Sequence, residues 1–335
     1  MKENVTLEHV ARKAGVSTAT VSRIINGTGK VSEERRQAVL KAIEEVGYSP
    51  NSLAQTLVKG QSMTIGVITQ DISSPFYGRI LKGIEQGLQG THYHPIIVSE
   101  EWRIDQHYQA IDHLMSRRVD AIIVLDSDPR TEQVLQAARH VPVVVVGREV
   151  PGHEKHCIYI DNFRGGHLAT KHLIALGHQH IVHLAGPDDH IDARDREAGY
   201  REALQEAGLP VQEDLVVKGY FNEKDALDAT ERLLASEVHF TAIFAGNDQA
   251  AEGAQLALYR QGLRVPQDVS VVGFDDLPSS AYSRPPLTTI HQPTLEMGKV
   301  TVQGVLDMLS GREFVSPEFS VRLVLRESTC PPRGK

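Results

Sequence analysis

One short segment of this sequence carries side chains that suit the major groove of DNA. In STATVSRIING, residues 17–27, three apolar residues at helical spacing form one stripe: Val21, Ile24 and Ile25. The opposite side then carries Thr18, Ala19, Ser22 and Arg23. An arginine forks onto guanine, threonine and alanine contact the thymine methyl group, and serine or threonine binds phosphate. These residues alone leave DNA binding and a solvated helix face equally open, because helix-turn-helix patterns give many false positives.

Enzymatic chemistry has less support in the sequence. Acidic residues could form a glycosidase pair, but acids on separate loops serve binding equally well. The sequence contains no G-x-S-x-G, P-loop or G-x-G-x-x-G motif. Histidines gather in HEKH, residues 153–156, and in HQHIVH, residues 178–183, without a cysteine pair or carboxylate at ligand spacing. We therefore expect no catalytic residue, metal or cofactor, and we place these histidines in solvated loops or at strand edges.

The elements that would position the DNA-contacting segment are three short helices within the first 48 residues. The expected N-caps are Thr6, Ser17 and Ser32. Gly15 and Gly47 are expected to end the first and third helices. The buried side of the third helix is expected to carry Ala38, Ile43 and Val46. Three helices with one apolar face each predict a compact bundle.

From residue 64 the sequence alternates apolar runs with amphipathic helical segments. The runs are TIGVIT, HPIIVS, DAIIVL, VPVVVVG, HIVHLAG, DLVVKG, TAIFAG and VSVVGF. Continuous Val and Ile runs are typical of parallel strands that are buried on both faces. Segments such as QHYQAIDHLMSRR and GGHLATKHLIALG would supply the crossover helices. We predict an α/β core with parallel sheets, whose eight strands form two sets that divide near residues 158–162.

Charge and composition narrow the class of protein. The chain has 335 residues, 41% of them hydrophobic, and no apolar run long enough to cross a membrane. Its net charge is −8, but residues 1–60 hold nine Lys or Arg against six Glu. A basic head therefore precedes an acidic body, as expected when only the head meets a polyanion. The N-terminus lacks the apolar stretch of a secretory signal and only two cysteines occur, so we expect a cytoplasmic protein without a membrane partner.

The first sixty residues strongly resemble the DNA-binding head of the LacI/GalR family of bacterial transcription regulators. The motifs V-A-x-x-A-G-V-S, T-V-S-R, N-G, V-S and G-Y-x-P-N-x-x-A stand in register, without a gap, through residues 6–60. The resemblance implies that Thr18, Ala19 and Arg23 read bases. It assigns phosphate contacts to Thr6, Ser17, Thr20, Ser22 and Asn26.

The segment NSLAQTLVKG, residues 51–60, matches the hinge helix of that family. It has too few apolar residues to be stable as an isolated helix. The resemblance implies that it folds on the operator and that Leu57 wedges into the central minor-groove step. Such a wedge costs unstacking energy and gains a bent site with more contacts. The neighbouring residues expected in the groove are Asn51, Ala54 and Gln55.

The remainder of the chain, to about residue 326, resembles the effector-binding core of the same family, which has the periplasmic sugar-binding-protein fold. In such folds two subdomains close over a small ligand at the carboxyl ends of their strands. The expected domains are residues 1–48 for DNA binding, 49–61 for the hinge, and 62–335 for effector binding and dimerisation. The two expected subdomains are about 62–161 plus 293–318, and 162–292 plus 319–335.

The resemblance and the strand ends together give the expected effector contacts. Trp102 is a candidate stacking platform for a sugar ring, and Phe221 is favoured over Tyr220 as the second aromatic contact. Asp192 stands where many relatives carry Ser or Thr, so the ligand chemistry is expected to differ there. The full set is Asp71, Ser74, Phe76, Trp102, Asp126, Arg148, Asp192, Arg196, Phe221, Asn247, Asp275 and Gln292.

Aromatic rings beside several Asp, Asn and Arg residues favour a mono- or disaccharide or a sugar derivative over a purine corepressor. We predict a homodimeric, nucleoid-associated repressor of a carbohydrate-utilisation operon, which its effector releases from a palindromic operator. The C-terminal STCPPRGK lacks the heptad helix that family tetramers use, so the expected state is a dimer. The alternatives are a metabolite-corepressed regulator, modulation by a partner protein, a sugar-binding module without a regulatory role, and an enzyme acting on sugars.

Overall fold

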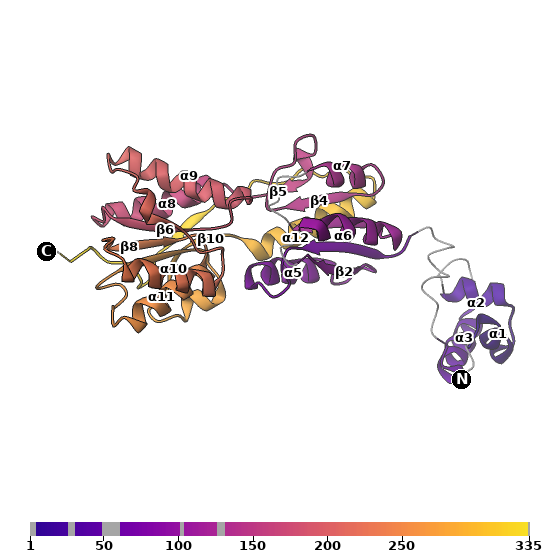
Figure 1. Ribbon diagram of the computed structural model, residues 1–335. Helices are drawn as coiled ribbons and strands as arrows, with labels where there is room; N and C mark the ends of the chain where they lie inside the picture. The colour runs from indigo at the N-terminus through magenta and orange to yellow at the C-terminus, as the bar shows by residue number, and fades with distance from the viewer. Residues whose placement is uncertain (1–4, 26–30, 49–60, 101–103, 126–130, 334–335) are drawn as a thin grey trace. The chain divides into compact units, whose positions relative to one another are not determined.

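The computed structural model describes residues 5–25, 31–48, 61–100, 104–125 and 131–333, with only the backbone described for residues 104–108. The chain divides into two compact units, Met1–Met63 and Thr64–Lys335 (Figure 1). None of the described helices is both long and apolar enough to span a bilayer. The first unit is helical and the second is α/β, so the predicted fold class is confirmed.

The first unit contains α1 (Leu7–Ala14), α2 (Thr18–Ile25) and α3 (Glu33–Val46). The backbone N–H of Thr20 donates to Ser17 Oγ at 3.2 Å, which makes Ser17 the N-cap of α2, as the sequence predicts. Gly15 and Gly47 end α1 and α3 in the left-handed conformation, with φ of 66° and 64°. The buried residues of the three helices form one core: Val10, Ala11, Val21, Ile24, Val39 and Ala42.

The buried face of α3 differs from the expected one by part of a turn. Val39 and Ala42 are the fully buried residues, Ile43 and Val46 pack partly against the same core, and Ala38 is exposed. These four apolar positions follow the i, i+3, i+4, i+7 spacing of one helix face. Ala38 lies one residue before that face, so its assignment to the buried side was wrong.

The second unit has two lobes, each built on one sheet. Lobe I contains β1 (Thr64–Thr69), β2 (His94–Ser99), β3 (Ala121–Leu125), β4 (Val143–Val146) and β5 (Cys157–Ile158), paired in parallel in the order β2-β1-β3-β4-β5. Its helices are α5 (Pro75–Leu88), α6 (Ile104–Ser116), α7 (Glu132–Ala138) and α12 (Thr294–Leu309). Successive residues of β3 pack on opposite faces, with Ile123 toward α5 and α12 and Val124 toward α6 and α7. Burial on both faces explains the continuous apolar runs.

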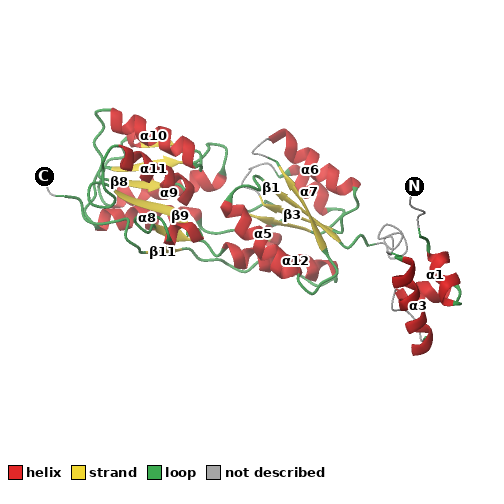
Figure 2. Ribbon diagram, turned by 90° about the horizontal axis from the view of Figure 1, so that it is seen from below, coloured by secondary structure: helices red, strands yellow, loops and turns green. Residues whose placement is uncertain are grey.

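Lobe II contains β6 (Ile181–Ala185), β7 (Val216–Lys218), β8 (Ala242–Ala245), β9 (Ser270–Asp275), β10 (Thr288–His291) and β11 (Arg322–Val324), in the order β11-β10-β9-β8-β6-β7. Only the β10–β11 pair is antiparallel. Helices α8 (Asn162–Ala175) and α9 (Ile191–Glu206) pack on one face, and α10 (Glu223–Ala235) and α11 (Asp248–Arg260) on the other (Figure 2). All eight predicted strands are present, and the short strands β5, β10 and β11 were not predicted.

Both lobes repeat one strand order, which determines where a ligand can bind. The order β2-β1-β3-β4-β5 of lobe I is repeated in lobe II as β7-β6-β8-β9-β10. In such sheets the connections leave in opposite directions from the first and third strands of each set, and this switch point opens a crevice at the carboxyl ends. The crevices follow β1 and β3 in lobe I, and β6 and β8 in lobe II.

Close packing of α8 against α9 fixes the helix that enters the crevice of lobe II. A Cβ atom on Gly199 of α9 would lie 2.1 Å from the carbonyl oxygen of Phe163, and one on Gly166 of α8 would lie 2.2 Å from that of Arg196. Only glycine permits backbones to approach this closely. The position of α9, and of the side chains in its first two turns, is therefore set by backbone contact.

Candidate functional site

A cavity of about 480 Å³ lies between the two lobes, at the carboxyl ends of β1, β6, β8 and β9. Residues of lobe I line one side, among them Asp71, Ser74 and Phe76. Lobe II supplies the larger side from the loops that precede α9, α10 and α11. The cavity has the size of a pocket for a small metabolite, and both switch points open into it.

Arg196 is the most tightly held polar residue of this cavity. Its Nε donates to Oδ1 of Asn162 at 2.9 Å, and its Nη1 donates to the carbonyl oxygen of Gly246 at 2.7 Å. The guanidinium lies over the ring of Phe274, with 3.8 Å between its central carbon and the ring centroid. The side chain is only 4% exposed. A donor held in this way is preorganised for an oxygen-rich ligand.

Two carboxylates flank the guanidinium of Arg196. Asp192 Oδ2 lies 3.7 Å from Nη2, and Asp275 Oδ1 lies 3.9 Å from Nη1. Burial raises the pKa of Asp275 well above its ordinary value, and the charge of Arg196 opposes that rise. Gln292 Nε2 donates to Asp275 Oδ1 at 2.7 Å, so Gln292 orients this carboxyl. The group presents two acceptors and one forked donor to the cavity.

Aromatic rings form the apolar part of the wall. The ring of Phe221 packs on two glycines, because a Cβ on Gly186 would lie 2.3 Å from it and one on Gly246 2.9 Å. Both Tyr220 and Phe221 have positive φ values, 50° and 60°, and both line the cavity. Such a strained turn is retained where a side chain must be aimed. Phe76 meets Tyr77 edge to face across the cavity wall at 5.1 Å between centroids.

The mouth of the cavity brings both lobes into contact. Ser74 Oγ, in lobe I, donates to Gln249 Oε1, in lobe II, at 3.4 Å. Asn222 caps α10 by accepting from the N–H of Asp225 at 2.8 Å, and its Nδ2 donates to the Asp225 carboxylate at 2.6 Å. Asp71 lies opposite, in the loop that follows β1. Polar groups from both lobes can therefore contact one ligand.

The structure brings most of the expected effector contacts together. The residues that line the cavity are Asp71, Ser74, Phe76, Asp192, Arg196, Phe221, Asn247 and Asp275. Gln292 lies beneath them, in a narrow crevice that Asp192 and Arg196 also line. Trp102 and Asp126 lie outside the described residues. The roles of all these residues remain predictions.

Arg148 is placed elsewhere by the fold. It follows β4, which is two strands away from β1 in the sheet, and it lines a different cavity of about 820 Å³ beside the interlobe connections. Val146 and Gly147, at the end of β4, line the narrow crevice beneath the effector cavity, but Arg148 itself lines the second cavity. The expectation that Arg148 contacts the effector has no geometric support.

Several lining residues were not predicted from the sequence. They are Tyr77, Asp189, His190, Asn222, Asp225 and Gln249, and Tyr220 lines the cavity as well as Phe221. Most of them cap a helix or stand in its first turn, directly after a loop that follows a strand of lobe II. A sequence prediction that included the first turn of the helix after each strand would have identified most of these residues.

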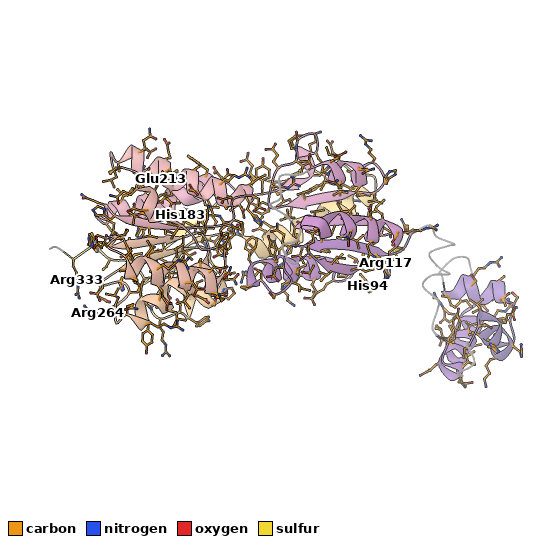
Figure 3. All side chains as sticks on the ribbon, viewed as in Figure 1. His94, Arg117, His183, Glu213, Arg264 and Arg333 are labelled. Carbon is orange, nitrogen blue, oxygen red and sulfur yellow. The ribbon has the colours of Figure 1, made fainter. Side chains whose placement is uncertain are left out.

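Two of the three histidines of HQHIVH, His178 and His183, are buried, contrary to the expected solvated position, and His180 is half-buried. His178 donates or accepts at both ring nitrogens, 2.8 Å from Thr241 Oγ1 and 2.9 Å from the carbonyl oxygen of Cys330. His183, labelled in Figure 3, is fully buried in lobe II. Its ring stacks between those of Tyr200 and Phe244, at 5.2 and 4.7 Å between centroids. Residues of β6 face the core on both sides, which explains the error. Among the described residues no cluster that could hold a metal occurs.

The helical unit exposes the predicted DNA-reading residues. Thr18, Ala19 and Arg23 of α2 are exposed, while Val21 is fully buried on the opposite side. Ser17 and Thr20 share a contact of 2.9 Å between their hydroxyl oxygens, and Thr6 begins α1. Asn26 and the hinge residues Asn51, Ala54, Gln55 and Leu57 lie outside the described residues. An exposed polar face on a helix fixed by its apolar stripe is what groove binding requires.

Comparison with known proteins gives matches over nearly the whole chain. Residues 6–51 match the family described as bacterial regulatory proteins, lacI family, and residues 62–317 match periplasmic binding proteins and sugar binding domain of LacI family. The chain is 35% identical to the ribose operon repressor of Escherichia coli (strain K12) over 324 residues, 96% of this chain and 98% of that protein. It is also 35% identical to the HTH-type transcriptional repressor PurR of Vibrio campbellii (strain ATCC BAA-1116) over 330 residues, 96% of this chain and 99% of that protein.

Solved structures show the same similarity. The Lac repressor dimer bound to operator and the anti-inducer ONPF superposes with a TM-score of 0.87 at 32% identity, over 98% of this chain and 100% of that one. The complex of the transcriptional regulator CelR with cellobiose gives a TM-score of 0.71 at 35% identity, over 97% of this chain and 99% of that one.

Proposed function

The chain belongs to the LacI family of DNA-binding transcription regulators, which are not enzymes, and on that premise we propose that it represses a carbohydrate-utilisation operon until a small sugar binds. The sugar would bind in the cavity between the two lobes. The observation that carries this proposal is the group formed by Arg196, Asp192 and Asp275 beside the Phe221 ring. Carboxylates accept from vicinal hydroxyls, the guanidinium donates, and the ring covers an apolar sugar face.

The proposed DNA-binding part is the helical unit. Thr18, Ala19 and Arg23 would read bases from the exposed face of α2, and Thr6, Ser17, Thr20, Ser22 and Asn26 would hold phosphates. Residues 49–61 would form the hinge, in which Leu57 enters the minor groove beside Asn51, Ala54 and Gln55. The protein would act as a homodimer on a palindromic operator, with α5 at the dimer contact. It would therefore work in the cytoplasm, at the nucleoid.

Release from DNA requires a coupling between the two sites. A sugar that contacts both lobes, for example Ser74 in lobe I and Arg196 in lobe II, fixes one arrangement of the lobes. The sugar shifts the protein toward the DNA-free state only if it binds that state more tightly, and operator must then weaken sugar binding by the same factor. In the proposed mechanism the lobes I of a dimer move relative to each other, and the two hinge segments separate.

Calorimetric titration of the full chain against neutral mono- and disaccharides, with purine nucleobases as the competing class, tests the proposal. Gel shifts with DNA from upstream of its own gene, with and without the sugar found, test regulation. We expect one sugar to bind at a stoichiometry of one per chain without being consumed, and to release the DNA. Binding of a nucleobase that strengthens the DNA complex would indicate a corepressed regulator, and a protein that binds neither sugar nor DNA would refute the proposal.

The variant Asp275→Asn adds a control inside the cavity. It keeps the shape of the side chain and replaces one carboxyl oxygen beside Arg196 by an amide nitrogen, which donates hydrogen bonds and accepts none. Sugar affinity should fall while operator affinity stays at the wild-type value. The matched variant Asp228→Asn, on the exposed side of α10 where Asp228 pairs with Lys224 at 3.1 Å, should change neither affinity.

A further inference from the structure

The cavity holds more negative than positive side chains. Five carboxylates line it: Asp71, Asp189, Asp192, Asp225 and Asp275. Arg196 is the one Lys or Arg among its described lining residues. It lies between Asp192 and Asp275, at 3.7 and 3.9 Å, so its charge balances Asp192, while burial raises the pKa of Asp275 well above its ordinary value and favours the neutral form. The charges of the remaining acids are compensated by backbone dipoles or by a positively charged ligand, or they remain uncompensated.

Helix dipoles supply part of the missing positive charge. The residues that precede α5, α9, α10 and α11 all line the cavity: Ser74, His190, Asn222 and Asn247. The N-terminus of a helix is equivalent to about half an elementary charge. Four such ends offset about two carboxylates, and Arg196 offsets a third. Because burial favours the neutral form of Asp275, the cavity retains about one uncompensated negative charge.

Two of the acids that line the cavity, Asp71 and Asp225, come from opposite lobes. Asp71 Oδ1 accepts from both the N–H and the hydroxyl of Ser73 at 2.7 Å, and Asp225 Oδ2 accepts from Asn222 Nδ2 at 2.6 Å. Within the described part of the chain, the second oxygen of each carboxylate accepts no hydrogen bond. The contact of Ser74 with Gln249 shows that the two lobes approach each other here.

We propose that this cavity selects its effector by charge: it prefers an amine-bearing sugar to the neutral parent sugar and rejects the phosphorylated one. The inference rests on the proposed function, since it concerns the same effector site. The ammonium group would lie between Asp71 and Asp225, and the hydroxyls would reach Arg196 and Asp275. A cation that contacts both lobes would also stabilise the closed arrangement.

The size of the preference follows from the strength of charged interactions. A hydroxyl that donates to a carboxylate already forms a charge-assisted bond, so the ammonium adds the Coulomb attraction between opposite charges, which at a solvent-open site gives a preference of about tenfold over the parent sugar. A phosphate dianion meets the same uncompensated charge with the opposite sign, so it should bind at least about tenfold more weakly than the parent. Both differences should shrink at high salt, because the mouth is open to solvent.

Titration calorimetry of the full chain with matched ligands tests the inference. The probes are glucose, galactose and mannose, each with its hexosamine and its hexose phosphate, at low and high salt. In the series that binds, the hexosamine should bind about tenfold tighter than the hexose, and the phosphate more weakly. A hexosamine that gains nothing, or a phosphate that equals its parent, overturns the inference and leaves the proposed function standing.

If no member of the three series binds, the inference is overturned, and the wider panel of sugars and nucleobases decides separately on the proposed function. Single substitutions show which carboxylates cause the preference for the hexosamine. Asp71→Asn and Asp225→Asn should each remove most of the hexosamine advantage, measured in each variant as the ratio of hexosamine affinity to parent-hexose affinity. Asp228→Asn, one turn further along α10 and outside the cavity lining, should keep the full advantage.

Discussion

The guanidinium of Arg196 lies over the ring of Phe274, with 3.8 Å between its central carbon and the ring centroid. Arg196 belongs to α9 and Phe274 to β9, so the contact joins the helix that enters the cavity to the sheet beneath it. Hydrogen bonds to Asn162 and Gly246 hold the same group in place. A cation with so many fixed contacts acts as a preformed ligand donor.

The first prediction is that Arg196→Lys abolishes the effector response and leaves operator binding intact. A lysine keeps the charge, but it loses the planar group over Phe274 and the forked bonds to Asn162 and Gly246. Effector affinity should fall at least about tenfold, since a charged hydrogen bond is lost in a buried site. Calorimetry measures this loss, and gel shifts show whether the protein still binds DNA and has therefore folded.

The matched control is Arg201→Lys, also on α9. Arg201 pairs with Glu213 on the outer side of the lobe at 2.7 Å, away from the cavity. Its substitution should leave effector affinity unchanged. Equal effector affinity in Arg196→Lys and in the wild type would show that Arg196 supports the fold and does not contact the ligand.

A second prediction concerns the glycine contact between α8 and α9. Gly199→Ala adds a Cβ that would lie 2.1 Å from the carbonyl oxygen of Phe163, so α9 must move and carry Arg196 with it. We expect a loss of about 1–3 kcal/mol in the free energy of unfolding, although alanine is the better helix former. Effector affinity should fall together with stability. Urea unfolding and calorimetry on the same preparation measure the two effects.

Gly78→Ala separates helix propensity from the clash. Gly78 lies within α5, and a Cβ there would meet no atom within 4 Å. The free energy of unfolding should rise by about 0.5–1 kcal/mol. A similar gain in Gly199→Ala would mean that the close approach of α8 and α9 relaxes without cost.

A third prediction follows from the buried ring of His183. Its Nδ1 donates to the carbonyl oxygen of Phe244 at 3.1 Å, and burial lowers its pKa to about 3. The unfolded chain takes up a proton near pH 6.5, which the folded chain cannot hold. The contribution of neutral His183 to the free energy of unfolding is therefore fully present above pH 6.5 and is lost as the pH falls from 6.5 toward 3. When the pH is lowered from 7 to 5, protonation of His183 in the unfolded chain alone should decrease the free energy of unfolding by about 2 kcal/mol.

His183→Phe removes the titrating group and keeps an aromatic ring between Tyr200 and Phe244. Urea unfolding at pH 7 and pH 5 should show a loss about 2 kcal/mol smaller in this variant than in the wild type. The pKa values of His172 and His178 are also lowered by burial, so the free energy of unfolding of the variant should still fall with decreasing pH, by a smaller amount. Exposed His140, replaced by Gln, should leave the wild-type slope unchanged, and an unchanged slope in His183→Phe would contradict the assignment.

The apolar runs located the main strands because a parallel strand buried on both faces must be apolar at every position, as β3 and β4 are. The short strands β5 and β11 lie at sheet edges, and β10 is an interior strand whose sequence, TTIH, mixes polar with apolar residues, so none of the three forms such a run. The strand ends located Asp71, Asn247 and Asp275 for the same topological reason, whereas Arg196, in the second turn of α9, came from the family resemblance. Arg148 failed because strand order, which the sequence does not reveal, puts β4 away from the switch point. Asp225 and Gln249 were missed because they enter the cavity from helix starts.

The last prediction is that exchanging Thr18 and Ala19 changes which operator is bound and nothing else. Both residues are exposed on α2, whereas Val21 and Ile24 anchor the helix in the head core. The swap therefore leaves the fold and the effector cavity untouched, and it alters only groups that reach base edges. Selection from a randomised half-site library should give a different preferred sequence, with a switch of about tenfold or more in relative affinity. Val21→Ala, which opens a hole in that core, should weaken binding to all half-sites alike. If the swap behaves like Val21→Ala, then α2 serves the fold of the head and does not read DNA.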